Sequence, residues 1–87
     1  MNKRSRDEIR AAVFDVLGNI APETDPGTIV ADQPLREQVD LDSFDFLNVI
    51  IMLHEVLVVE IPESDYVEFS TLDSEVAYLA RRCGADA

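Results

Sequence analysis

Ser43 is the residue of this sequence that could most readily take part in chemistry. Its hydroxyl lies between Asp42 and Asp45, where an apolar segment begins. A serine becomes a nucleophile when a base lies within hydrogen-bond reach. The one histidine, His54, follows eleven residues later. On a helix the two would lie about 20° apart in rotation but about 16 Å apart along the axis. The pair therefore cannot act as nucleophile and base, and we expect His54 to be a partly buried helix residue.

Other combinations of residues that could do chemistry are weak. Asp40, Asp42 and Asp45 could bind a divalent cation weakly, but they lack the spacing and the closing glutamate of a calcium loop. One cysteine, Cys83, excludes an intramolecular disulfide and a zinc site that needs a cysteine pair. The three glycines form no phosphate-binding motif. We predict no metal site and no catalytic residue, so Ser43 is either a helix cap or a point of covalent attachment.

Composition restricts the class of protein further. The 87 residues suit one domain, 1–87, with a modest core. The formal net charge is −11, from 18 acidic and 7 basic residues, which argues against binding to nucleic acid or anionic membranes. The most apolar run, 46–53, is far shorter than the ~20 residues of a membrane span. No apolar run follows Lys3 and Arg4 as in a secretory signal, so we expect a soluble, cytoplasmic protein.

Hydrophobic periodicity predicts an all-α bundle of three long helices and one short helix. Ser5 and Glu8 have the spacing of a capping box, so the first helix should cover 6–20. The second should cover 43–57, with an apolar face formed by Phe46, Val49, Ile50, Leu53 and Leu57. A short third helix should begin at Pro62 and reach about 67. Ser70 or Thr71 should cap the last helix, with Gly84 as its terminator.

The segments between these helices should be irregular. Residues 22–42 form a long loop, with one helical turn expected at 32–35, and loops of this length are usually functional or held by side chains. Five apolar residues could hold it: Ile29, Val30, Leu35, Val39 and Leu41. Residues 58–62 should be an extended connector with Ile61 pointing inward, since there is no second strand to pair with. We expect frayed ends at 1–4 and 84–87.

The four residues around the serine resemble a known signature. Asp42-Ser43-Phe44-Asp45 is similar to the Asp-Ser-Leu-Asp signature of acyl carrier proteins, with Phe44 in the leucine position. The resemblance covers nearly the whole chain and includes further matches at Leu35, Glu60-Ile61-Pro62, Ser70-Thr71-Leu72 and Tyr78-Leu79. The short motif alone is unspecific, but at this length, acidity and helix order the chain is identified as a member of the acyl carrier family, whose members bind phosphopantetheine.

This resemblance implies a function for the serine. In the family, a separate Mg²⁺-dependent phosphopantetheinyl transferase moves a 4′-phosphopantetheine arm from coenzyme A to the serine, here Ser43. The terminal thiol of the arm then holds an acyl group as a thioester, so the protein is a carrier on which other enzymes act. Asp42 and Asp45 would flank the cofactor site, where their charge would keep the arm from lying down near its root. Alternatively, Asp42 would help to hold the transferase's metal ion or its basic residues.

Two larger sets of residues follow from the same resemblance. An acyl pocket between the second and third helices would be lined by Phe46, Val49, Ile50, Leu53, Ile61 and Phe69, although the same residues could simply form the core. Because Phe46 and Phe69 are bulky, we expect a short or poorly sequestered acyl group. A docking surface for partner enzymes would be formed by Phe44, Leu47, Asn48, Ile51 and Glu55.

The second helix departs from the family pattern by carrying few acidic residues. We therefore expect a freestanding acyl carrier protein of a specialised lipid or secondary-metabolite pathway rather than of general fatty-acid synthesis. Its loading and transfer enzymes should present basic or apolar docking patches. An aminoacyl or peptidyl carrier and an unmodified acidic adaptor remain as alternatives. We expect a monomer, with weak self-association through Phe44, Ile51 and Met52 as the other possibility.

Overall fold

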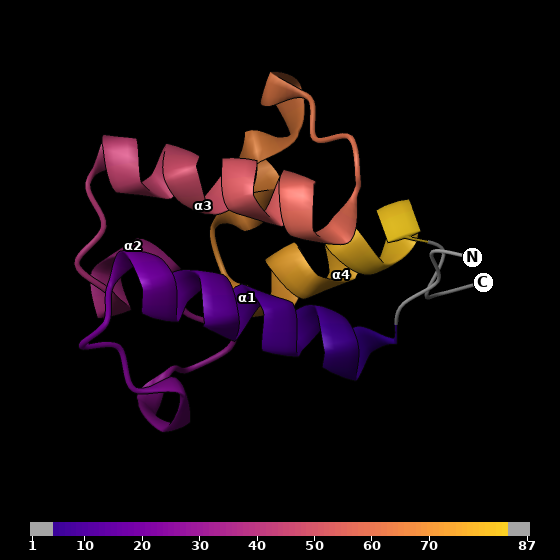
Figure 1. Cartoon of the computed structure of the whole chain (residues 1–87). Helices are drawn as coiled ribbons and strands as arrows, with labels where there is room; N and C mark the ends of the chain where they lie inside the picture. The colour runs from indigo at the N-terminus through magenta and orange to yellow at the C-terminus, as the bar shows by residue number, and fades with distance from the viewer. Residues whose placement is uncertain (1–4, 84–87) are drawn as a thin grey trace.

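Three long helices surround one hydrophobic core in the computed structural model, which describes residues 5–83 (Figure 1). In chain order the elements are α1 (Arg6–Ile20), η1 (Pro26–Thr28), α2 (Leu35–Gln38), α3 (Ser43–Leu57), η2 (Glu63–Phe69) and α4 (Leu72–Cys83). Between residues 5 and 83 there is no strand, and the predicted all-α class is confirmed. No helix in this range is both long and apolar enough to cross a membrane.

Helix α1 has the predicted bounds because its start and its end are both determined locally. The Glu8 amide donates to Ser5 Oγ at 3.1 Å, and the Ser5 amide donates to Glu8 Oε1 at 2.9 Å, which completes the capping box. Ala21 ends the helix immediately before Pro22. The buried face of the helix consists of Ile9, Val13, Val16 and Leu17.

The long first loop contains two short helical segments. The expected turn at 32–35 is wrong by about three residues, because Pro34 has an extended ψ of 127° and precedes α2 rather than lying within it. Leu35, Val39 and Leu41 are buried and hold the loop as predicted, whereas Val30 is 52% exposed. Ile29 is half-buried against the core.

A polar side chain that the sequence did not single out also holds this loop. Gln38 Oε1 accepts from the Val30 amide at 2.6 Å, and Gln38 Nε2 donates to the carbonyls of Val30 and Gln33 at 2.9 and 3.0 Å. These three bonds fold residues 30–38 into a compact unit. The backbone of Val30 is thus fixed although its side chain faces solvent.

Helix α3 also has the predicted bounds. Its buried face consists of Val49, Ile50, Leu53 and Leu57, while Phe46 is half-buried. The helix ends at Val58, which has a left-handed φ of 52° and is 71% exposed. The amides of Val58 and Val59 both donate to the His54 carbonyl. His54 itself is exposed rather than partly buried, and its Nδ1 lies 2.5 Å from the Val59 carbonyl oxygen.

Residues 58–62 are extended, as expected, with Ile61 half-buried against the core. The short helix that follows, η2, is a 3₁₀ helix and ends at Phe69, two residues later than predicted. Thr71 caps α4, because its Oγ1 accepts from the Ser74 amide at 3.0 Å. The expected terminator Gly84 and the two expected frayed ends lie outside the described residues.

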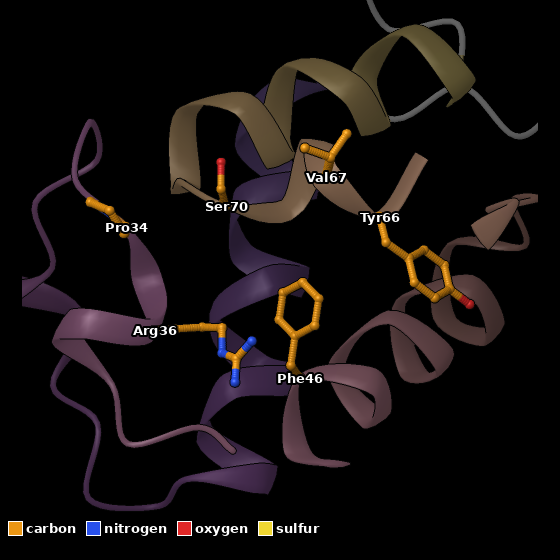
Figure 2. Close-up of a pocket in the computed structure, with 6 residues that line it drawn as sticks. All are labelled: Pro34, Arg36, Phe46, Tyr66, Val67 and Ser70. Atoms are coloured by element: carbon orange, nitrogen blue, oxygen red, sulfur yellow. The ribbon is translucent and has the colours of Figure 1, made fainter. Parts of the chain in front are cut away.

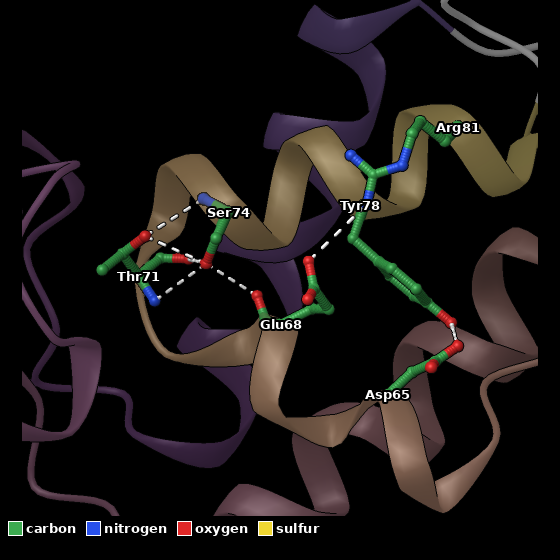
Figure 3. A network of polar contacts seen from close by, with 6 residues as sticks. All are labelled: Asp65, Glu68, Thr71, Ser74, Tyr78 and Arg81. Carbon is green, nitrogen blue, oxygen red and sulfur yellow. Dashed lines mark hydrogen bonds and ion pairs between the residues drawn. The ribbon is translucent and has the colours of Figure 1, made fainter.

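A polar network joins η2 to α4 (Figure 3). Ser74 Oγ donates to the Glu68 carbonyl at 2.7 Å, and Tyr78 Oη donates to Asp65 Oδ2 at 2.6 Å. The Tyr78 ring also packs edge-on against Phe69, with the ring centroids 5.5 Å apart. These contacts fix η2 against α4.

The start of α2 is bound to the junction between η2 and α4. The Leu35 amide donates to the Ser70 carbonyl at 2.8 Å, and the Asp73 amide donates to the Ala31 carbonyl at 2.9 Å. Pro34 and Thr71 form an isolated antiparallel bridge at the same place. As a result α2, the first turns of α3, and η2 surround one region of the surface.

Candidate functional site

Ser43 is the first residue of α3, and its side chain is exposed. The helix is capped by Asp42, whose Oδ1 accepts from the Asp45 amide at 2.8 Å. Among the described residues, Ser43 Oγ has no hydrogen-bond partner. The alternative role of Ser43 as the helix cap is therefore wrong, and its hydroxyl is accessible for another use.

The backbone around Ser43 favours a negatively charged group. Within residues 5–83, the amides of Ser43 and Phe44 have no acceptor, whereas the next two amides, of Asp45 and Phe46, are bonded to Asp42. Free amides and the positive end of the helix dipole attract an anion such as a phosphate. Asp42 and Asp45 oppose this attraction with two negative charges, so the site suits a phosphate held by a covalent bond better than a free one.

Among residues 5–83, no side chain is hydrogen-bonded to the Ser43 hydroxyl. His54 lies in the last turn of α3, at the opposite end of the helix, where its ring contacts the Val59 carbonyl. In the described part of the chain, no group of three or more His, Cys, Asp or Glu residues could hold a metal ion.

The residues predicted to form a docking surface are mostly exposed along one flank of α3. Phe44 is 72% exposed, Leu47 39% and Ile51 44%, and Glu55 is exposed as well. Asn48 is half-buried. Exposed apolar residues that lie together often mark an interaction surface, and the docking role of this set stays a prediction. Met52, by contrast, packs partly against the core.

The residues predicted to line an acyl pocket do not surround one cavity. Val49, Ile50, Leu53 and Phe69 are at most 3% exposed and belong to the packed core. A surface groove of about 350 Å³ is lined instead by Pro34, Arg36, Phe46, Tyr66, Val67 and Ser70 (Figure 2). A smaller cavity of about 140 Å³ is lined by Ile50, Ile51, His54, Glu60, Ile61 and Tyr66. Phe46 and Ile61 thus face different cavities, and an acyl-binding role for the set stays a prediction.

Two residues that the sequence reading missed stand out in the structure. Arg36 lies in α2 and borders the groove next to Phe46. Glu75 lies in α4 and is 1% exposed, and its Oε1 has no hydrogen-bond partner in the described chain. Burial raises the pKa of Glu75 from 4.5 to about 8, so this carboxyl is mostly protonated at pH 7. Glu75 follows Leu72 by three residues and precedes Leu79 by four, so the three share one helix face. This spacing was the signal in the sequence that Glu75 would be buried.

A small all-α bundle with an exposed serine at the start of a long helix has the features of a carrier domain. A sequence profile described as "phosphopantetheine attachment site" matches residues 7–79. The chain belongs to this phosphopantetheine-binding family, and the predicted relationship to acyl carrier proteins is confirmed. Its cofactor is a covalently bound 4′-phosphopantetheine, which supplies a terminal thiol for thioester formation.

The chain is similar in sequence to proteins named as acyl carrier proteins. The chain is 29% identical over 76 residues to an acyl carrier protein of Chlamydia trachomatis, a match that covers 87% of this chain and 92% of the relative. It is 27% identical over 74 residues to a mitochondrial acyl carrier protein of Neurospora crassa, covering 85% of this chain. The aligned part spans only 55% of the Neurospora protein.

Proposed function

We propose that Ser43 is the attachment residue for 4′-phosphopantetheine and that the chain carries an acyl group as a thioester on this arm. The observation that carries the proposal is the exposed Ser43 hydroxyl, which has no hydrogen-bond partner among the described residues and lies at the first position of a fifteen-residue helix. The position lies within the segment that matches the family. The chain would then act as a scaffold for other enzymes rather than as a catalyst.

The other described serines support this choice by their surroundings. Ser5 Oγ accepts a hydrogen bond in the capping box, and Ser74 Oγ is bonded to Glu68 and Thr71. Ser64 lies in the short 3₁₀ helix η2, and Ser70 is the C-cap of that helix. Ser43 therefore combines an unbonded hydroxyl with the N-terminus of a long helix.

The carboxylates beside Ser43 would serve the modifying enzyme. In the proposed reaction, Ser43 Oγ forms a bond to the phosphorus next to the pantetheine of coenzyme A. The bond to the adenosine-bearing phosphate breaks, and the serine proton passes to the transferase. Asp42 is exposed and lies one residue from the attacking oxygen, so its second oxygen can approach the transferase's Mg²⁺ ion or its basic residues. Asp45 is half-buried and would repel the phosphate at the root of the arm, which leaves the rest of the arm free to move.

The apolar surface exposed along one flank of α3 supports docking to enzymes that are specific for this carrier. Phe44, Leu47 and Ile51 expose apolar surface, while Asn48 and Glu55 are the polar members of the docking set. A partner with a matching apolar patch would bind this surface, and the net charge of −11 would speed its approach if it also carried basic residues. We therefore propose a specialised pathway rather than general fatty-acid synthesis. The cytoplasmic location stays a prediction.

The proposal is tested by mass spectrometry of the purified chain after incubation with coenzyme A, Mg²⁺ and a broad-specificity phosphopantetheinyl transferase. We expect the wild-type chain and the Ser64→Ala control to gain the mass of one phosphopantetheine group, and Ser43→Ala to gain none. Fragmentation of the product should place the group on Ser43. A wild-type chain that gains no mass would refute the proposal and support the unmodified acidic adaptor.

A comparison of loaded forms tests the nature of the cargo. The relatives named above are both called acyl carrier proteins, which supports an acyl rather than an aminoacyl group. We expect acyl-transferring enzymes encoded near this gene to charge the modified chain. Charging by an amino-acid-activating enzyme instead would assign the chain to the aminoacyl or peptidyl carriers.

A further inference from the structure

We propose that the groove beside Ser43 holds a short acyl cargo whose far end carries a carboxylate, and that Arg36 is the residue that selects it. The inference rests on the proposed attachment at Ser43 and adds the chemical class of the cargo. It starts from the position of the groove, whose wall includes Phe46, one helical turn after Ser43 on α3. Residues three apart lie on the same side of a helix, so a tethered group that turns back along α3 reaches the groove first.

The walls of the groove are apolar and fixed. Phe46 rises from α3 between Arg36 of α2 and the residues Val67 and Ser70 at the end of η2 (Figure 2). Val67 is 74% exposed, so its side chain is available to cover a ligand. The hydrogen bond from the Leu35 amide to the Ser70 carbonyl holds the two sides of the groove together. At about 350 Å³ the groove lies near the lower end of the range for small-molecule sites, about 300–1,000 Å³.

The core behind the groove offers no comparable space. Val49, Leu53 and Phe69 are at most 3% exposed and pack closely, and to insert a chain among them would require the core to expand. A short cargo therefore lies in the groove, where apolar surface is already available. Its methylene groups would cover Phe46 and Val67.

Arg36 gives the groove its charge preference. Its guanidinium carbon lies 5.3 Å from the centre of the Phe46 ring, and its Nε donates one long hydrogen bond of 3.4 Å to the Leu41 carbonyl. Among residues 5–83, no carboxylate forms an ion pair with it. Its two terminal nitrogens are free to bind a carboxylate in the two-point geometry that arginine favours. In a chain of net charge −11, an arginine that borders an apolar groove without an acidic partner favours an anionic ligand.

The cargo class can be tested with two matched thioesters. The chain is loaded from adipyl-coenzyme A or hexanoyl-coenzyme A by the transferase, and loading is scored first by mass. Two-dimensional NMR then follows the Arg36 Nε–H and Val67 methyl signals. We expect adipyl loading to shift both signals relative to the arm alone, and hexanoyl loading to shift only the methyl signals.

A rate measurement gives the size of the effect. Hydroxylamine cleaves exposed thioesters, so cargo that lies in the groove is cleaved more slowly. For an exposed ion pair we expect Arg36→Gln to accelerate cleavage of the adipyl thioester about two- to fivefold and to leave the hexanoyl thioester unchanged. Arg10→Gln is the matched control, because Arg10 also lies over a phenylalanine, 5.6 Å from the Phe14 ring centre, but on α1.

Several results would overturn the inference. Equal shifts of the Arg36 signal with adipyl and hexanoyl cargo would show that the carboxylate is not bound. If attachment of the arm without cargo already shifts the Arg36 signal of the unmodified protein by the same amount, Arg36 binds the phosphate of the arm. The same acceleration in Arg10→Gln would show a general charge effect. If no loading occurs, the proposed function fails. Binding to the groove is then tested without the arm, by titrating Ser43→Ala protein with the adipyl and hexanoyl thioesters of N-acetylcysteamine. Only the adipyl thioester should shift the Arg36 signal.

Discussion

The buried carboxyl of Glu75 should make this protein less stable as the pH rises from 5 to 8. The side chain is 1% exposed, its Oε1 lacks a hydrogen-bond partner in the described chain, and burial raises its pKa from 4.5 to about 8. Between these values the folded chain keeps a proton that the unfolded chain releases. Because the folded state binds more protons, its stability falls with increasing pH throughout this interval.

The expected magnitude follows from the two pKa values. Each pH unit between them lowers the unfolding free energy by about 1.4 kcal/mol. Relative to pH 4.5, the loss is about 3 kcal/mol at pH 7 and approaches about 4 kcal/mol above pH 8. A domain of this size has an unfolding free energy of roughly 4–13 kcal/mol, so one side chain controls a large part of it.

The measurement is urea unfolding, followed by circular dichroism at pH 5, 6, 7 and 8 and extrapolated to water. We expect Glu75→Leu to be more stable than the wild type by about 3 kcal/mol at pH 7 and to lose most of the pH dependence. Glu75→Gln should lose the same pH dependence while it still buries an amide, at a cost of about 1–3 kcal/mol. Glu55→Gln is the control, since it removes an exposed charge of the same type.

The control matters because the other acidic residues also repel one another more strongly as they ionise. Glu55→Gln should keep the wild-type slope, and the difference between its slope and that of Glu75→Gln isolates the buried group. If both Glu75 variants retain the wild-type slope between pH 5 and 8, the reasoning is refuted, because Glu75 would then be ionised in the folded state.

Three further predictions concern the ends of α3 and the contact between η2 and α4. Asp42→Asn should keep the helix cap, since asparagine caps as well as aspartate, but it should slow phosphopantetheine loading several-fold. A wild-type loading rate in a mass-spectrometric time course would show that the charge of Asp42 is not used. Val58→Gly should raise the unfolding free energy by about 1 kcal/mol, because φ is 52° at this exposed position, and a lower urea midpoint than wild type would contradict this. Tyr78→Phe should cost about 1 kcal/mol through the loss of its 2.6 Å bond to Asp65, and an unchanged midpoint would mean that water replaces the tyrosine hydroxyl without loss.

Features encoded by neighbouring residues could be predicted from the sequence. The spacing of Ser5 and Glu8 predicted the start of α1, and hydrophobic periodicity predicted α3 as Ser43–Leu57. For the cap of α3 the sequence pointed to Ser43, although Asp42 is an equally good capping residue. The structure gives this role to Asp42, whose Oδ1 accepts from the Asp45 amide, and this choice frees the Ser43 hydroxyl.

Features that need segments distant in the chain could not be predicted in the same way. The apolar residues of α3 were expected to share one pocket, but packing places Val49 and Leu53 in the core and Phe46 at the groove. Nothing in the sequence singled out Arg36 within the expected loop 22–42. It borders the groove only because the backbone of α2 is bonded to Ser70.

The sequence by itself determined the bounds of α1 and α3, the net negative charge and the place of Ser43 at a helix start, since capping and periodicity depend on residues within one or two helical turns of each other. The tertiary structure alone decided that the buried Glu75 Oε1 has no hydrogen-bond partner in the described chain and that Arg36 borders an apolar groove. The position of Arg36 depends on a contact between elements more than 30 residues apart, the bond between Leu35 and Ser70, and no local pattern encodes that contact.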